Sequence, residues 1–86
     1  MGNVLVIFKI YPEGPEEVEM VIEGLKTITV GDLKDVQRQP IGFGLDLVRA
    51  GFVIPDKTDG LMEKLENEIR TIKGLKEVEV EGSTLL

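Results

Sequence analysis

The chain reverses direction at the stretch QPIGFGL, residues 39–45, and this reversal decides how its strands can pair. Pro40 has no backbone N–H to donate, so a sheet ladder weakens at that residue. Gly42 and Gly44 can adopt positive φ angles, which a tight turn between two strands requires. The stretch therefore predicts a hairpin with Phe43 near its tip. The pattern alone favours a ring folded back onto the sheet; the other interpretation is an apolar knob for a partner's pocket.

The two segments that flank this hairpin differ in character. Residues 32–39 are polar except for Leu33 and Val36, which is typical of an edge strand. Residues 45–54 are almost wholly apolar in their second half, which is typical of a central strand. The apolar positions of this second segment change phase near Asp46. We expect a bulge or irregular pairing there.

Four further segments complete the pattern. Residues 3–11 are apolar on both faces and predict another central strand, whereas residues 75–81 carry glutamates on one face and predict an edge strand. Helices are predicted over residues 15–28 and from residue 58 or 59 to residue 73, because apolar residues recur there at helical spacing. Residues 82–86 are left as a tail.

This order of elements predicts an α+β fold, the ferredoxin-like βαββαβ sandwich. Right-handed crossovers and two apolar central strands give a four-stranded antiparallel sheet in the order 4-1-3-2. Both helices then cover one face of the sheet, and the other face is open. The hairpin and residues 85–86 lie at opposite ends, separated by roughly 25 Å for a strand of about eight residues. We expect residues 1–86 to form a single domain.

The composition excludes several classes of function. The chain contains no cysteine and no histidine, which removes disulfides, thiolate metal sites, the commonest general base and the commonest zinc ligand. A net charge of −6 disfavours binding to nucleic acid and favours a basic partner. No apolar run approaches the ~20 residues that span a bilayer, and no signal peptide is evident, so we expect a cytoplasmic protein without membrane contact.

Candidate sites for chemistry are weak. The alternating glutamates of residues 77–81 are typical of a solvated face. Gly42-x-Gly44 is too short for a dinucleotide fingerprint and lies between two strands rather than before a helix. Residues 56–59 resemble part of a cation loop but lack its later Gly and Glu. Without histidine, no hydroxyl has an obvious activating base. We therefore expect no catalytic residue, metal or cofactor, and recognition of a partner is the remaining role.

The segment PIGFGL, residues 40–45, resembles the I-A-F-G-(I/L) segment of the archaeal elongation factor 1-beta family, with Gly42 where alanine is usual. It also resembles the catalytic C-terminal domain of the eukaryotic exchange factor. The apolar third strand, the passage DKTD at residues 56–59 and a chain that ends just after the fourth strand support a resemblance along the whole chain. The family implies a ferredoxin-like fold. It further implies that GDP is exchanged for GTP on elongation factor 1-alpha through binding, without covalent chemistry.

The resemblance also implies partner-binding residues. Phe43 matches the aromatic residue that packs on the second domain of the GTPase, and we expect Ile41 and Leu45 to bind beside it. The C-terminus matches the segment that approaches the magnesium site of the nucleotide, which implicates Leu85 and Leu86.

One position departs from the eukaryotic pattern. Eukaryotic members carry a lysine next to their last residue, where this chain has Leu85. We hypothesise that Lys57, at the same end of the sheet, supplies the positive charge instead.

Proteins of other classes share this order of elements. A small-molecule-binding regulatory module of the ACT type would dimerise through its sheets and bind an amino acid, whereas we expect a monomer. An acylphosphatase-like enzyme is disfavoured because residues 11–14 offer no cation for a phosphate loop. An RNA-recognition domain is disfavoured by the acidic charge and by the lack of basic and aromatic strand motifs.

Overall fold

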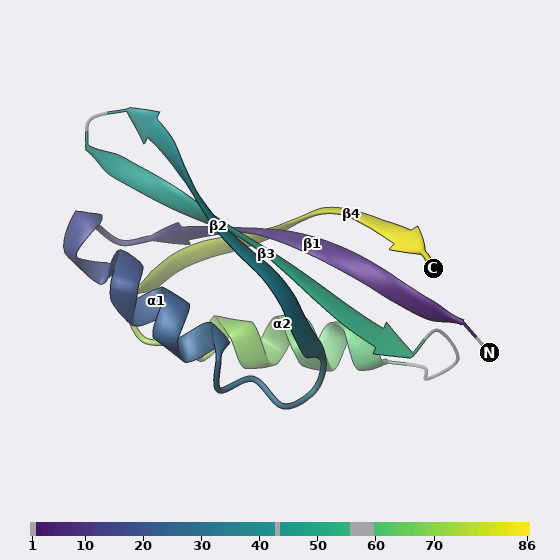
Figure 1. Ribbon diagram of the computed structural model, residues 1–86. Coiled ribbons are helices and arrows are strands. Elements are labelled where there is room, and N and C mark those ends of the chain that lie inside the picture. The colour runs from purple at the N-terminus through teal and green to yellow at the C-terminus, as the bar shows by residue number, and fades with distance from the viewer. Residues whose placement is uncertain (1, 43, 56–59) are drawn as a thin grey trace.

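The computed structural model describes residues 2–42, 44–55 and 60–86, and it confirms the predicted fold (Figure 1). The sheet has four strands in the order β2-β3-β1-β4, which is the predicted order, and each neighbouring pair is antiparallel. Both helices cover the same face. The elements are β1 (Asn3–Pro12), a short 3-10 turn (Pro15–Glu17), α1 (Val18–Leu25), β2 (Asp32–Gly42), β3 (Leu45–Pro55), α2 (Leu61–Arg70) and β4 (Leu75–Leu85).

The core lies between the helices and the two central strands. β1 and β3 are the two central strands, and their residues that face the helices are buried. Phe8 of β1 and Phe52 of β3 pack edge to face, with ring centroids 6.0 Å apart and planes at 78°. Around these rings lie further buried side chains from both layers: Val6, Ile10, Val18, Val21, Leu25, Val48, Ala50, Ile54, Leu65, Ile69 and Val78. Among the described residues, no polar or charged side chain is buried.

Helix α1 is shorter than predicted. The predicted span began at residue 15, but Pro15–Glu17 form a 3-10 turn and the α-helix covers Val18–Leu25. A Cβ atom on Gly24 would lie 2.5 Å from Cγ2 of Ile72, so this glycine lets the end of α1 approach the segment after α2 closely. The Thr27 hydroxyl donates to the Gly24 carbonyl at 2.7 Å. The helix ends where this contact and a competing local hydrogen bond replace its regular pattern.

Helix α2 also begins later than predicted. Residues 58 and 59, the predicted caps, lie outside the described residues, and the helix starts at Leu61 after Gly60 with φ at 77°. No described side chain caps it. The helix ends at Arg70, and Gly74 with φ at 89° follows as the break before β4. Neither helix within the described part of the chain is long and apolar enough to cross a membrane.

The predicted irregularity near Asp46 is present, but on the opposite strand. Pro40 faces Asp46 and Gly42 faces Leu45, so Ile41 of β2 is the extra residue. β3 itself continues regularly. Its change of phase arises because Leu45 and Leu47 point to the open face while the later apolar residues point to the helices.

The predicted C-terminal tail is wrong, because β4 continues to Leu85. It pairs with β1 as far as Val4, which faces Leu85, and the Leu86 N–H donates to the Asn3 carbonyl at 2.8 Å. The free edge of β1 offers backbone hydrogen-bonding groups to any residue type. That pairing outweighs the weak strand preference of Gly82 and its neighbours.

Candidate functional site at the two ends of the sheet

A two-stranded arm projects from the sheet at its hairpin end (Figure 1). The last residue of β1 that pairs with β3 is Ile10, opposite Val48, so residues 39–42 and 45–47 pair only with each other. We call these residues the hairpin arm. Gly42 and Gly44 have φ angles of 104° and 73°, which confirms the positive φ expected of them.

The arm carries two of the predicted partner-binding residues. Ile41 is 44% exposed, because it is the extra residue of the β2 irregularity and has no facing residue on β3. Leu45 is half-buried at the start of β3. Phe43 lies outside the described residues. The arm therefore carries both Ile41 and Leu45, and each lies two residues from the predicted aromatic in the sequence.

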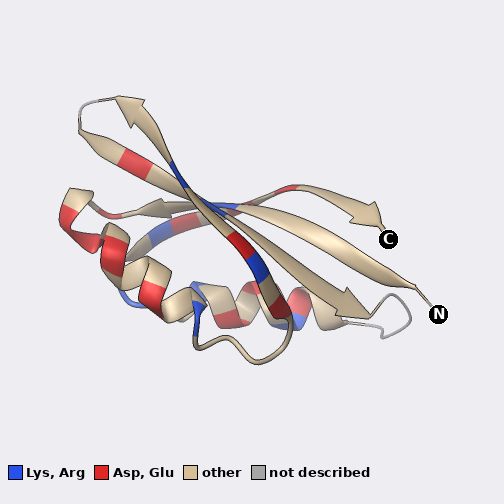
Figure 2. Cartoon of the chain, viewed as in Figure 1, with Lys and Arg blue, Asp and Glu red and all other residues tan. Residues whose placement is uncertain are grey.

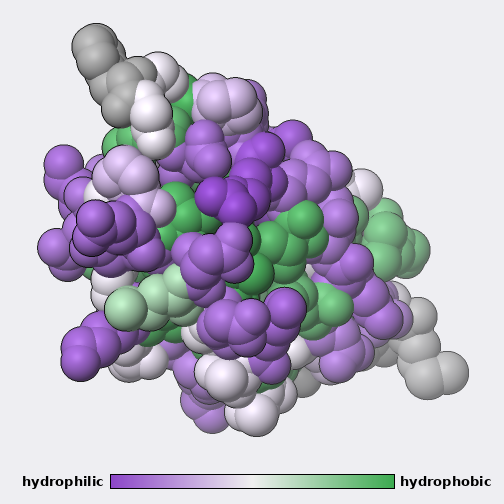
Figure 3. Space-filling model, turned by 60° about the vertical axis from the view of Figure 1, so that its left-hand side comes forward, coloured by the Kyte–Doolittle hydropathy of each residue, from purple (hydrophilic) through white to green (hydrophobic). Residues whose placement is uncertain are grey.

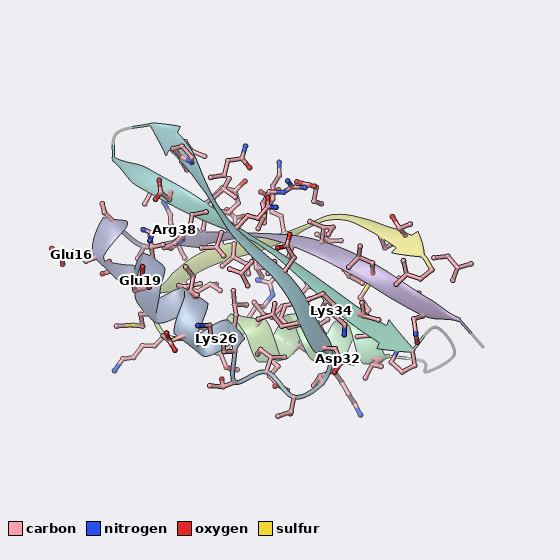
Figure 4. The ribbon with its side chains drawn as sticks, viewed as in Figure 1. Glu16, Glu19, Lys26, Asp32, Lys34 and Arg38 are labelled. Carbon is pink, nitrogen blue, oxygen red and sulfur yellow. The ribbon has the colours of Figure 1, made fainter. Side chains whose placement is uncertain are left out.

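Arg38 joins the root of the arm to helix α1. Its Nη1 lies 2.7 Å from Oε1 of Glu19 on α1, and its Nη2 lies 3.4 Å from Oδ2 of Asp46 on β3. Figure 4 shows the Arg38 and Glu19 side chains directed toward each other from β2 and α1. Arg38 occupies the row of Val48, the last row in which β1 still pairs with β3. This contact therefore links three elements at the point where the arm leaves the sheet.

The opposite end of the sheet carries the other pair of predicted residues. Leu85 is 66% exposed and Leu86 is 63% exposed, so both apolar side chains are largely open to water. They lie beside Asn3, which also faces Pro55 at the end of β3. Lys57 lies outside the described residues.

The structure keeps the two groups of residues far apart. From Leu45 at the arm to Pro55 at the other end, β3 makes ten steps, or about 33 Å at ~3.3 Å per residue. The longest dimension of the described molecule is 43 Å. The predicted separation of roughly 25 Å was too short because β3 is longer than the strand assumed for it.

The open face of the sheet carries a group of charged residues, of which the sequence analysis considered only Glu81, as part of a solvated face. Arg49 of β3, Lys9 of β1 and Glu81 of β4 form a row across three strands. Arg49 Nη2 lies 2.5 Å from Glu81 Oε2, and Lys9 Nζ lies 3.8 Å from Glu81 Oε1. The available signal was Arg49 itself, a single charge within the apolar run LVRAGFVI of residues 47–54.

A shallow hollow of about 220 Å³ adjoins this row. The residues that line it are Ile7, Asp35, Gln37, Arg49, Ala50 and Gly51. Arg49 Nε is buried there and has no hydrogen-bond partner among the described residues. The lining of the hollow thus combines a carboxylate, an amide and a guanidinium group.

Charge is spread over the molecule rather than gathered at one end. Figure 2 shows acidic residues on both helices and on the strands, interspersed with lysine and arginine. Figure 3 shows that hydrophilic residues cover most of the face in view, with smaller apolar patches between them. Within the described residues, no group of three or more acidic side chains is arranged to hold a metal ion.

Comparison with known proteins gives the decisive observation. A family model described as the EF-1 guanine nucleotide exchange domain matches residues 5–86. The chain belongs to the EF-1 guanine nucleotide exchange domain family. This confirms the resemblance seen at residues 40–45. The match runs through the hairpin arm and the C-terminal leucines, so both ends of the sheet lie inside the exchange domain.

Relatives of this exchange domain match along nearly their whole length. Elongation factor 1-beta of Methanoculleus marisnigri is 38% identical over 86 residues, covering 100% of both chains. Elongation factor 1-beta of Ignicoccus hospitalis is 37% identical over 84 residues, covering 94% of this chain and 89% of its own. The family assigns the chain a role in translation elongation.

Solved structures support the fold of the exchange domain. The ACT domain from the GTP pyrophosphokinase of Chlorobium tepidum superposes with a TM-score of 0.56 at 10% identity, covering 93% of this chain and 99% of that one. The C-terminal domain of the MgtC protein from Mycobacterium tuberculosis superposes with a TM-score of 0.54 at 16% identity, covering 100% of this chain and 88% of that one. At these identities the likeness concerns the fold alone.

One titratable group in the exchange domain is clearly perturbed. A hydrogen bond to the Glu79 side chain raises the pKa of Tyr11 above its usual value of 10.0, and burial and the negative charges of Glu79 and Glu77 add to the increase. Tyr11 and Glu77 face each other on β1 and β4. The raised pKa means that the protonated phenol is favoured in the folded protein.

Proposed function

We propose that this protein is an elongation factor 1-beta that promotes exchange of GDP for GTP on elongation factor 1-alpha. The match of the exchange-domain family over residues 5–86 carries the proposal. It acts as a single domain and a monomer in the cytoplasm. It promotes exchange by binding the GTPase, without covalent chemistry and without a cofactor or metal. It contacts neither nucleic acid nor a membrane.

The mechanism follows from linkage between two binding equilibria. The protein binds the nucleotide-free GTPase more tightly than the GDP-bound form. By reciprocity, the GTPase holds GDP more weakly while the exchange factor is bound, and GDP leaves faster. A 10³-fold loss of affinity for GDP corresponds to about 4 kcal/mol of differential binding.

The geometry supports contact with two separate parts of the GTPase. Ile41 and Leu45 of the hairpin arm, together with Phe43 between them in the sequence, bind the second domain. Leu85 and Leu86, about 33 Å away at the other end of β3, approach the nucleotide site. Exposed apolar side chains at both ends favour this arrangement, because their burial against a partner releases water from apolar surface.

The charge distribution bears on how the partner is attracted. A net charge of −6 favours association with a basic surface and raises the rate of encounter at low salt. At the C-terminal end, Lys57 supplies the positive charge that eukaryotic members place next to their last residue. Converting Lys57 to Ala lowers the rate of GDP release if this assignment is right, and an unchanged rate removes it.

The decisive experiment measures release of labelled GDP from elongation factor 1-alpha of the same source. Phe43→Ala slows the stimulated release at least about tenfold, since a buried aromatic anchor is commonly worth ~2 kcal/mol or more. The matched control is Val80→Ala. Val80 is 42% exposed but lies in the middle of β4, away from both ends. Full-speed exchange by Phe43→Ala, or no stimulation by the unaltered protein, contradicts the proposal.

A second candidate is a module that binds a free amino acid. The hollow on the open face favours it, because Asp35 in its lining matches an ammonium group and the Arg49 guanidinium matches a carboxylate. Thermal denaturation in the presence of each amino acid separates the two functions. A rise in Tm with one amino acid supports the module, and no rise with any of them removes it.

A further inference from the structure

The last strand contains a β-bulge at Glu81. Phe8 of β1 faces Val80 of β4, but the next residue of β1, Ile7, faces Gly82. Glu81 is therefore extra on β4. A β-bulge bends the strand that carries it and changes the direction in which a side chain points.

The side chain of the bulged residue is held by cations from two other strands. Glu81 contacts Arg49 of β3 and Lys9 of β1 on the open face. The Glu81 and Arg49 side chains are 32% and 36% exposed, so the pair is less hydrated than an ordinary surface pair. Lys9 and Arg49 face each other on neighbouring strands, which places two positive charges beside the bulge.

The bulge determines where the chain end lies. With Glu81 extra, Leu85 faces Val4, whose side chain packs against the core, so Leu85 points to the helix-bearing side of the sheet. If Glu81 instead paired with Ile7, every later residue would move by one position. Leu85 would then face Asn3 and point to the open side, and the chain end would shift by ~3.4 Å.

The residues after the bulge do little to choose between these registers. Gly82, Ser83 and Thr84 carry no large apolar side chain, and a strand without an apolar face specifies its register weakly. In the observed register Glu81 contacts Arg49 and Lys9, whereas in the regular register it would face Ile7. We infer that the contacts with Arg49 and Lys9 distinguish the two registers.

We propose that Glu81 is a positioning residue for nucleotide exchange. Its bulge, held by Arg49 and Lys9, fixes the register of residues 82–86 and so the place and the direction of Leu85 and Leu86. The inference rests on the proposed function only in assigning those leucines to the nucleotide site.

Two changes at this position separate positioning from direct contact with the partner. Glu81→Lys repels Arg49 and Lys9 and disfavours the bulge. Deletion of Glu81 removes the same carboxylate but joins Val80 to Gly82, which leaves both halves of β4 in their present register as a regular ladder. Glu77→Lys on the same strand is the matched control, because it changes the net charge as Glu81→Lys does without touching the bulge.

NMR on the full chain tests the register. In the unaltered protein, the deletion variant and Glu77→Lys, we expect Leu85–Val4 contacts and a protected Leu86 amide. In Glu81→Lys these contacts are lost or replaced by Leu85–Asn3 contacts. If Glu81→Lys keeps the Leu85–Val4 contacts and the Leu86 protection, the bulge does not depend on Glu81 and the inference is overturned.

The GDP-release assay tests the link to exchange. Glu81→Lys lowers the maximal release rate at saturating protein at least about tenfold, since a displacement of an ångström or more can cost that much. Its half-saturating concentration changes less, because the hairpin arm is intact. The deletion variant releases GDP at close to the unaltered rate. A deletion variant as slow as Glu81→Lys, with Leu85 still beside Val4, shows that Glu81 contacts the partner and overturns positioning. If the unaltered protein fails to stimulate release, the proposed function fails while the NMR result still decides the register.

Discussion

At the scale of single residues, Gly24 sets how closely the end of α1 approaches the chain after α2. A Cβ atom there would lie 2.5 Å from Cγ2 of Ile72. Ile72 is β-branched, so its side chain has few alternative rotamers into which it could withdraw. A position inside a helix would ordinarily gain from alanine, by about 1 kcal/mol relative to glycine. For alanine at position 24, the clash with Ile72 therefore opposes the gain in helix propensity.

We predict that Gly24→Ala lowers the free energy of unfolding by about 1–3 kcal/mol, because the cost of overpacking exceeds the gain in helix propensity. Urea denaturation followed by circular dichroism measures it. Gly82→Ala is the control, since a Cβ there meets nothing within 4 Å and we expect no loss of stability. A Gly24→Ala protein as stable as the parent would show that Ile72 moves freely.

Tyr11 gives the molecule a pH-dependent contribution to stability. Its pKa is raised in the folded state, first by the hydrogen bond to Glu79 and then by burial and the nearby carboxylates. The protonated phenol is therefore favoured by folding. Its contribution is fully present below the unfolded pKa of about 10 and is lost as the pH rises through the higher folded value.

We predict that the difference in unfolding free energy between the parent and Tyr11→Phe shrinks or changes sign at alkaline pH. Urea denaturation of both proteins at about pH 9 and about pH 11 measures it, and the comparison cancels the titration of lysines common to both. A difference independent of pH would mean that the Tyr11 pKa is not coupled to folding.

At the scale of elements, the hairpin arm depends on its root. Two strands paired only with each other are marginally stable in water. Arg38, in the row just before the arm, contacts Glu19 of α1 and Asp46 of β3. Both side chains of the Arg38–Glu19 pair are exposed, so we expect ~0.2–1 kcal/mol from it.

We predict that Arg38→Gln accelerates amide exchange in the hairpin arm by up to about fivefold, the rate equivalent of ~1 kcal/mol, and leaves exchange in β1 unchanged. Arg70→Gln is the control, because Arg70 pairs with Glu66 within α2 at 3.0 Å and has no contact with the arm. Equal exchange in the arm of both variants would assign its stability to the ladder alone.

Much of the architecture could be predicted from the sequence, because buried positions recur as apolar residues at the spacing of a strand or a helix. The apolar stretches at residues 3–11 and 45–54 identified the central strands, and the polar residues 32–39 identified an edge. The end of β4 could not be predicted, since backbone pairing to β1 holds residues 82–85 whatever their side chains. The partners of Arg38 and Arg49 depend on strand register, which no local pattern records.

The candidate site was predicted unevenly for the same reason. The positions of Ile41 and Leu45 at one end, and of Leu85 and Leu86 at the other, followed once the strand order was known. The Glu81 bulge could not be predicted. A glutamate that alternates with valine has the pattern of a regular, outward-pointing strand residue, and only its cross-strand neighbours reveal the bulge. Roles in partner binding came from the family resemblance rather than from any pattern of burial.

At the scale of the whole molecule, one apolar core supports both ends. Phe8 and Phe52 join the central strands at its middle, and each is fully buried. A chain of this size has a small total stability, of about 5–15 kcal/mol at most. The loss of one ring is therefore a large fraction of the whole.

We predict that Phe52→Ala lowers the free energy of unfolding by about 3–5 kcal/mol. Val53→Ala, the next residue on the opposite and open face, loses less because its side chain is only half-buried. Thermal denaturation of both variants measures the difference. Equal losses would mean that the open face contributes as much packing as the helix face.

Strand β1 has a mechanical consequence for any partner that grips both ends. It pairs with β3, which leads into the hairpin arm, and with β4, which carries the last leucines. Within the described residues, β1 thus connects the strand that leads into the arm with the strand that carries the chain end, and it acts as a strut between the two ends. A two-domain partner must adjust its own geometry to fit, and only those of its conformations that match the strut are stabilised by the full set of contacts.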